Sequence, residues 1–158
     1  MAEGATDILT KPVSMHDLLR RVEMFTRGLR AADLLVDRSM TGAYLTELSR
    51  TLGNDGAFLD FLDSGITDLE ETMSKLDAVS KQGVGPELAV TAHSLKGVAG
   101  NLGLELMREI AGNLESQVVN NQVDRDVLGS EIAVLHSMAD DGVREIRERF
   151  IVPLRAAA

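Results

Sequence analysis

Apolar residues recur along most of this chain at the spacing of an amphipathic helix. In four long segments they fall every three or four residues, which places them on one face of an α-helix. Gly, Asn and Pro gather in the short breaks between these segments, as is typical of turns. The segments are residues 55–81, 86–101, 104–119 and 124–150, and Asp124 is expected to cap the last of them. The pattern therefore predicts four helices with short connections.

Four amphipathic helices bury their apolar faces best as an antiparallel bundle. Two shorter periodic segments, residues 14–30 and 40–52, predict helices that lie across this bundle. Only residues 8–10 have the character of a strand, and Pro153 is expected to end the last helix. We therefore predict an all-α fold: an antiparallel four-helix bundle with extra N-terminal helices.

The composition fits this fold and excludes several alternatives. Apolar residues make up 44% of the 158 residues and charged residues 26%, which is the balance of a globular domain. Aromatic residues make up only 3%, whereas β-sandwiches and barrels use more aromatic filling. The chain has no Cys, which excludes a disulfide scaffold and any site built on a thiolate.

The charge balance is acidic, with 16 basic residues against 25 acidic residues and a formal net charge of −9. Proteins that bind nucleic acid usually carry a basic excess or stripe, so we expect no nucleic-acid partner. No apolar run approaches the roughly 20 residues of a membrane span, and the N-terminus lacks the pattern of a signal peptide. We therefore expect a cytoplasmic location without direct membrane contact.

Segment 86–101 has two distinct faces. One is an apolar stripe formed by Leu88, Ala92, Leu95, Ala99 and Leu102. The other holds His93, Lys96, Gly97 and Gly100, which lie within about 100° of one another around the helix axis. His93 is therefore expected on the flank of the helix, beside the core and open to solvent. A glycine inside a helix costs about 1 kcal/mol relative to alanine, so Gly97 and Gly100 need a reason. Bare backbone beside an exposed imidazole leaves room for another molecule to approach closely.

These residue types suit the carriage of a phosphoryl group. The neutral imidazole, which is populated near neutral pH, offers an unprotonated ring nitrogen as a nucleophile. Lys96, one turn away, puts a cation where a phosphoryl group on His93 would lie. The second ring nitrogen needs an acceptor that fixes the tautomer. Glu115 is the candidate, because the chain turns back at Gly103, a typical helix C-cap.

Each of these residues also has an ordinary interpretation. A single histidine on a helix is usually structural or merely exposed, and Lys96 and Glu115 could be solvated surface charges. His16 and His136 lack a neighbouring glycine and lysine, so we interpret both as ordinary residues of a helix surface or flank. No set of His, Asp and Glu has metal-ligand spacing, and no P-loop motif occurs. We therefore expect no metal, no cofactor and no enzymatic activity in this chain.

Residues 92–103, which read AHSLKGVAGNLG, resemble the signature of the histidine-containing phosphotransfer (HPt) domain. Leu106 and the pair Leu114 and Glu115 continue the likeness, which covers about residues 40–150.

The resemblance implies a role for each residue of the exposed face. His93 would be the phosphorylated residue, and Lys96 would support its phosphoryl group. Gly97, together with Gly100, would clear the approach of a partner receiver domain. Glu115 stands where the family usually has Gln or Glu near the imidazole.

Residues 4–13 and 17–22 resemble the last strand and last helix of a receiver domain. In that family the Lys of the Lys–Pro pair, here Lys11, contacts the aspartyl phosphate. The rest of a receiver is absent, including its acceptor aspartate, so the likeness implies a fragment of a longer protein. A receiver followed by an HPt domain is typical of hybrid sensor histidine kinases, and Met1 is either introduced or native.

These likenesses predict four parts of the chain. They are a receiver remnant (1–30), a linker (31–39), the HPt four-helix bundle (40–152) and a tail (153–158).

The implied function is that of a phosphorelay intermediate in two-component signalling. His93 would accept a phosphoryl group from the aspartyl phosphate of a receiver and pass it to another receiver aspartate. The magnesium would belong to the receiver, which would come from a response regulator or from the parent kinase. The parent could be an inner-membrane sensor with this part in the cytoplasm.

Two other functions compete with this one. The first is a helical adaptor that docks a receiver or another signalling partner without carrying phosphate. The second is a dimerising bundle that houses a kinase's own phosphoacceptor. It is disfavoured because Ser94, and not an acidic residue, follows His93.

Overall fold

The computed structural model of the chain describes residues 32–157. Over this range the fold is all-α, and no strand occurs in it. The helices are α2 (Ala32–Leu52), α3 (Asp55–Gln82), α4 (Pro86–Asn101), α5 (Glu105–Val119), α6 (Arg125–Ile146) and α7 (Val152–Ala157). The strand expected at residues 8–10, the helix expected at 14–30, and His16 and Lys11 lie outside the described residues.

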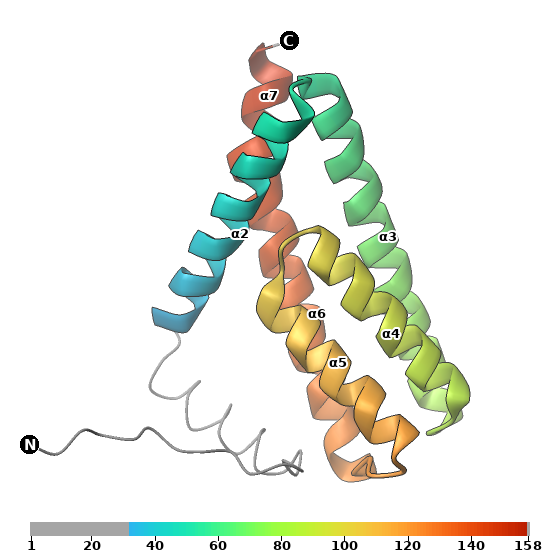
Figure 1. The fold of residues 1–158 in the computed structure, drawn as a ribbon. Helices are drawn as coiled ribbons and strands as arrows, with labels where there is room; N and C mark the ends of the chain where they lie inside the picture. The colour runs from blue at the N-terminus through green and yellow to red at the C-terminus, as the bar shows by residue number, and fades with distance from the viewer. Residues whose placement is uncertain (1–31, 158) are drawn as a thin grey trace, which may run out of the picture.

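Helices α3 to α6 form the predicted antiparallel four-helix bundle (Figure 1). Helix α4 packs against α5 and α3, and α6 closes the bundle against α3 and α5. Because α3 and α6 are longer than the hairpin of α4 and α5, they extend beyond its turn (Figure 1). Helix α2 packs against α3, α5 and α6 beside that turn.

The core is built from the predicted apolar stripes. On α4 the whole stripe is buried at 0% exposure: Leu88, Ala92, Leu95, Ala99 and Leu102. The rings of Phe58 and Phe150 meet edge to face with centroids 5.9 Å apart. Phe150 and Phe61 are only half-buried, at the rim of the core. Of the apolar residues in segment 40–52, Leu45 is fully buried and Leu48 is partly buried against the core, whereas Ala43 and Leu52 are exposed.

Polar side chains and one glycine define the ends of the helices. Asp124 caps α6 as predicted, since its carboxylate accepts a hydrogen bond from the amide of Asp126 at 3.0 Å. Gly103 ends α4 with φ of +70°, and the amide of the following Leu104 donates to the carbonyl of Ala99 at 2.9 Å. This is the expected glycine C-cap, which an L side chain would strain.

Two helix ends differ from the prediction. Helix α2 begins at Ala32, before the start of segment 40–52, in which the periodicity predicted a helix. Pro153 does not end the last helix, because a π-helical turn (Arg147–Ile151) intervenes and α7 follows directly. A proline lacks an amide and clashes with the carbonyl four residues earlier in a regular α-helix. In the π-helical turn the amide of Val152 donates to the carbonyl of Arg147, and this wider turn allows the chain to stay helical up to Pro153.

Within residues 32–157, no helix combines the length and apolar character needed to cross a membrane.

Candidate functional site

His93 lies on the flank of α4, away from the apolar stripe. Its side chain is 69% exposed, whereas the preceding Ala92 is fully buried. Both positions follow from the helical period, which turns consecutive residues by about 100°. The imidazole is therefore open to another molecule while the helix beneath it is anchored in the core.

Glu115 of α5 holds one nitrogen of the imidazole. The distance between Nδ1 of His93 and Oε1 of Glu115 is 2.8 Å. An ionised carboxylate only accepts hydrogen bonds, so Nδ1 must carry the proton. In the neutral ring this leaves the lone pair on Nε2. The contact that the sequence suggested between these two helices is present.

Lys96 reaches the other oxygen of the same carboxylate. Its Nζ lies 3.4 Å from Oε2 of Glu115. Partial burial, at 24% exposure, raises the pKa of the Glu115 carboxyl, but the hydrogen bonds from His93 and Lys96 outweigh it and leave that pKa below its ordinary value. Glu115 therefore stays ionised at neutral pH and links the imidazole to the ammonium group.

The two glycines of α4 have different surroundings. A methyl group built at Gly97 would meet nothing within 4 Å, so the backbone is bare there. At Gly100 the methyl would lie 3.0 Å from Cδ of Arg108, whose side chain covers this turn of α4. The open space that the sequence suggested is thus present at Gly97, whereas Gly100 is covered.

Two residues of α5 that the sequence did not single out also contribute to this surface. Arg108 makes two hydrogen bonds to Glu105 and lies over Gly100. Gly112 lies beneath the side chain of Lys96. Arg108 and Gly112 precede Glu115 by seven and three residues, and this spacing is a sequence signal that all three lie on one face of α5.

Exposed apolar side chains flank the histidine at one end of the site. Val90 precedes His93 by one turn of α4 and is 60% exposed, and Val119 follows Glu115 by one turn of α5 and is 66% exposed. Because the two helices are antiparallel, both valines lie toward the same end of the hairpin. These exposed valines lie on α4 and α5, beside the imidazole.

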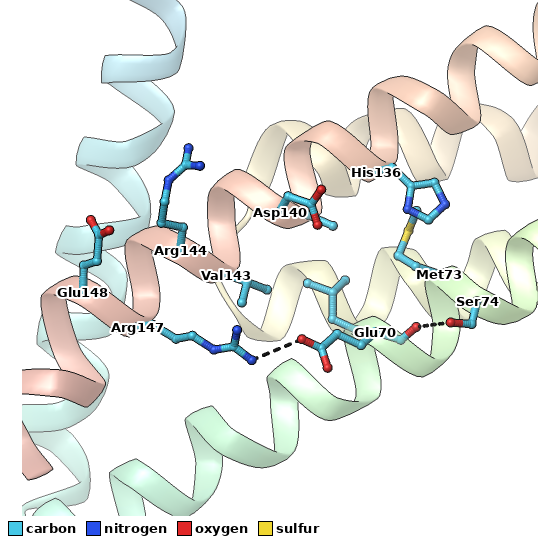
Figure 2. A pocket seen from close by; sticks show the side chains of 11 residues that line it. Glu70, Met73, Ser74, His136, Asp140, Val143, Arg144, Arg147 and Glu148 are labelled. Carbon is cyan, nitrogen blue, oxygen red and sulfur yellow. Dashed lines mark hydrogen bonds and ion pairs between the residues drawn. The ribbon is translucent and has the colours of Figure 1, made fainter.

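His136 lies on α6, in a different setting. Its Nε2 is 2.9 Å from both carboxylate oxygens of Asp77 on α3. It borders a groove of about 500 Å³ between α3 and α6, in which Arg147 reaches Glu70 at 3.2 Å (Figure 2). In this groove the histidine has no lysine among the lining residues. It joins two helices, in keeping with its interpretation as an ordinary flank residue.

Comparison with known proteins identifies the family. Residues 57–144 match the sequence model of the Hpt domain, and this match spans more than half of the chain. The chain therefore belongs to the Hpt domain family. No curated protein and no solved structure gave a match.

Membership of this family indicates a phosphotransfer role in two-component signalling. Hpt domains are phosphoryl carriers and not enzymes, and they interact with receiver domains.

Proposed function

We propose that this domain carries a phosphoryl group on His93 between the aspartates of two receiver domains. The observation that supports the proposal most directly is the 2.8 Å contact between Nδ1 of His93 and Glu115, which leaves Nε2 unprotonated on an exposed imidazole. An oriented nitrogen lone pair that faces solvent is what a nucleophile for an external phosphoryl group requires.

In the transfer, the Nε2 lone pair of His93 attacks the phosphorus of an aspartyl phosphate. A nitrogen–phosphorus bond forms, the bond from phosphorus to the aspartyl oxygen breaks, and the carboxylate leaves with its electron pair. The ring gains positive charge because Nδ1 keeps its proton, and the Glu115 carboxylate stabilises that charge at 2.8 Å. Transfer to a second receiver reverses the same step.

Lys96 supports the phosphoryl group in this proposal. Its ammonium lies beside Glu115, one turn of α4 from His93, and its side chain is 41% exposed. A cation at this place neutralises charge on the phosphoryl oxygens. The magnesium that activates the aspartyl phosphate belongs to the receiver.

The receiver docks over the α4–α5 hairpin. Bare backbone at Gly97 allows close approach, and Val90 and Val119 provide apolar contact beside the imidazole. We assign Gly97 to docking, whereas Gly100 acts through the Arg108 side chain that covers it.

We also propose that the parent protein is a hybrid sensor histidine kinase and that this part of it lies in the cytoplasm. The likeness of residues 4–13 to the end of a receiver domain supports this, and the region of Lys11 lies outside the described residues. The donor receiver would then belong to the parent chain or to a separate response regulator.

The test is phosphotransfer from a radiolabelled, phosphorylated receiver of the same organism. We expect acid-labile, base-stable label on the wild-type domain and none on His93→Gln, because glutamine lacks the nucleophilic ring nitrogen. His136→Gln is the matched control, since it removes a second helix histidine that contacts a carboxylate, and it should keep the label. A folded wild-type domain that docks receivers yet never takes up label would instead establish the adaptor.

A further inference from the structure

The side chain of Lys96 lies across α5 on Gly112. A methyl group built at Gly112 would lie 3.4 Å from Cδ of Lys96, 3.5 Å from Cε and 3.9 Å from Nζ, and these are the three nearest atoms. The space above Gly112 is therefore occupied by the lysine stem, and no backbone of α4 comes as close. The lysine stem therefore leaves room for a methyl group at residue 112 but not for a larger side chain.

The position of Gly112 along α5 determines where the ammonium group lies. Gly112 precedes Glu115 by three residues, so both residues lie on one face of α5. A stem that crosses α5 at Gly112 delivers Nζ to Oε2 of Glu115, at 3.4 Å. A side chain at residue 112 longer than a methyl group would lift the stem away from this face.

A second cationic side chain of the hairpin also packs on a glycine of the opposite helix. Arg108 of α5 crosses α4 on Gly100, where a methyl group would lie 3.0 Å from its Cδ. A carboxylate then holds each cation, Glu115 for Lys96 and Glu105 for Arg108. The hairpin thus pairs each long cationic side chain with a glycine of the opposite helix.

We propose that Gly112 is a positioning residue, whose lack of a large side chain lets the Lys96 stem cross α5 so that the ammonium stays beside Glu115 and within reach of a phosphoryl group on His93. The consequence for phosphorylation rests on the proposed function, whereas the placement of Lys96 against Glu115 does not.

The first measurement is the titration of the Glu115 carboxyl by carbon-13 NMR. Lys96 lowers the pKa of Glu115, so Lys96→Ala should raise it. Gly112→Leu should raise it to the same value, and the double variant should raise it no further. Gly112→Ala should leave the titration unchanged, because its methyl group stays in ordinary contact with the stem.

The second measurement is the rate at which phosphoramidate, a small phosphoryl donor, labels His93. Gly112→Leu and Lys96→Ala should each slow labelling roughly tenfold, because each removes one charge-assisted contact. The double variant should be no slower than Lys96→Ala alone, since Gly112 acts through the lysine. Gly129→Leu is the matched control, because Gly129 is an exposed helix glycine of α6 with nothing within 4 Å, and it should leave both measurements unchanged.

The proposal is wrong if Gly112→Leu leaves the Glu115 titration unchanged, or if it slows labelling further in the Lys96→Ala background. The second result would mean a steric effect that does not involve the lysine. If Gly112→Leu loses its helical circular dichroism, Gly112→Val takes its place with the same expected outcomes. Failure of the proposed function is separate: wild-type His93 would remain unlabelled, and the Glu115 titration would still decide the role of Gly112.

Discussion

Glu131 is a carboxylate buried in the apolar core. It is only 1% exposed, and neither of its oxygens has a hydrogen-bond partner in the part of the chain that the structure describes. Burial, with a smaller contribution from the negative charge of Asp124, raises the pKa of Glu131 from 4.5 to about 7. A group of this kind makes the stability of the fold depend on pH.

The expected effect is a loss of stability as the pH rises. Below the unfolded-state pKa the carboxyl is protonated in both states, and its cost to the fold is small. Between about pH 4.5 and about pH 7 the unfolded chain releases this proton while the folded protein keeps it, so stability falls over this range and levels off once the buried carboxyl also ionises. The cost approaches about 3 kcal/mol at most, since each pKa unit corresponds to about 1.4 kcal/mol.

Urea unfolding at about pH 5 and about pH 8 measures this dependence. Glu131→Gln has the same shape but cannot ionise, so its unfolding free energy should fall less than that of the wild type over this interval. Equal falls in the two proteins would show that Glu131 does not carry the dependence.

At the scale of elements, the turn between α4 and α5 depends on α2. The hydroxyl of Thr41 donates to the carbonyl of Gly103 at 2.8 Å. A methyl group at Gly103 would lie 2.6 Å from Cδ1 of Tyr44, so the Tyr44 ring packs directly on the glycine. Helix α2 thus supports the turn of the hairpin that carries His93.

Gly103→Ala should destabilise the fold more than Gly53→Ala. Both glycines have positive φ, so both substitutions incur roughly 1–2 kcal/mol of backbone strain. Gly53 has nothing within 4 Å of an added methyl group, whereas Gly103 has the Tyr44 ring. Thermal unfolding of the two variants gives the difference. Tyr44→Ala should recover part of the loss in the Gly103→Ala background, and equal losses for the two glycines would contradict the support from α2.

Periodicity predicted helix ends correctly where a proline or a glycine marks the end in the sequence. The ends of α4 agree because Pro86 begins it and Gly103 follows it, and both effects are local. The end of α6 was missed because no single residue type predicts the π-helical turn that lies before Pro153.

The candidate site was predictable to the same extent. His93, Lys96 and Gly97 share one helix face, so their spacing could be read directly. Gly112 was missed because nothing in its own segment shows which side chain packs on a single helix glycine. Its environment depends on how the Lys96 side chain crosses from α4, which is a fact of three-dimensional packing. Glu131 was missed because a polar residue on a core-facing position does not continue an apolar stripe.

Across the whole molecule, the core and the candidate site occupy different faces of the same helix. Leu95 of α4 is fully buried, and His93, two residues before it, is 69% exposed. Removing an exposed side chain forfeits little burial, so His93 can be replaced without unfolding the bundle. The groove between α3 and α6 involves neither helix of the hairpin that carries His93. Variants of the site can therefore be compared at nearly constant stability.

The net charge of −9 makes the folded state sensitive to salt. Compact folding brings like charges together, and salt screens their repulsion. The ion pairs that oppose this trend are solvent-exposed, such as Arg147 with Glu70 and Arg155 with Asp63, and exposed pairs contribute little. We expect the melting temperature to rise by about 2–4 °C, equivalent to about 1 kcal/mol, as sodium chloride increases at moderate concentrations.

Thermal unfolding at low and moderate sodium chloride checks this expectation. Replacing the exposed Glu71 with lysine reduces the net negative charge, so Glu71→Lys should show a smaller rise than the wild type. A melting temperature that falls as salt increases would mean that the exposed ion pairs contribute more to stability than the excess negative charge costs.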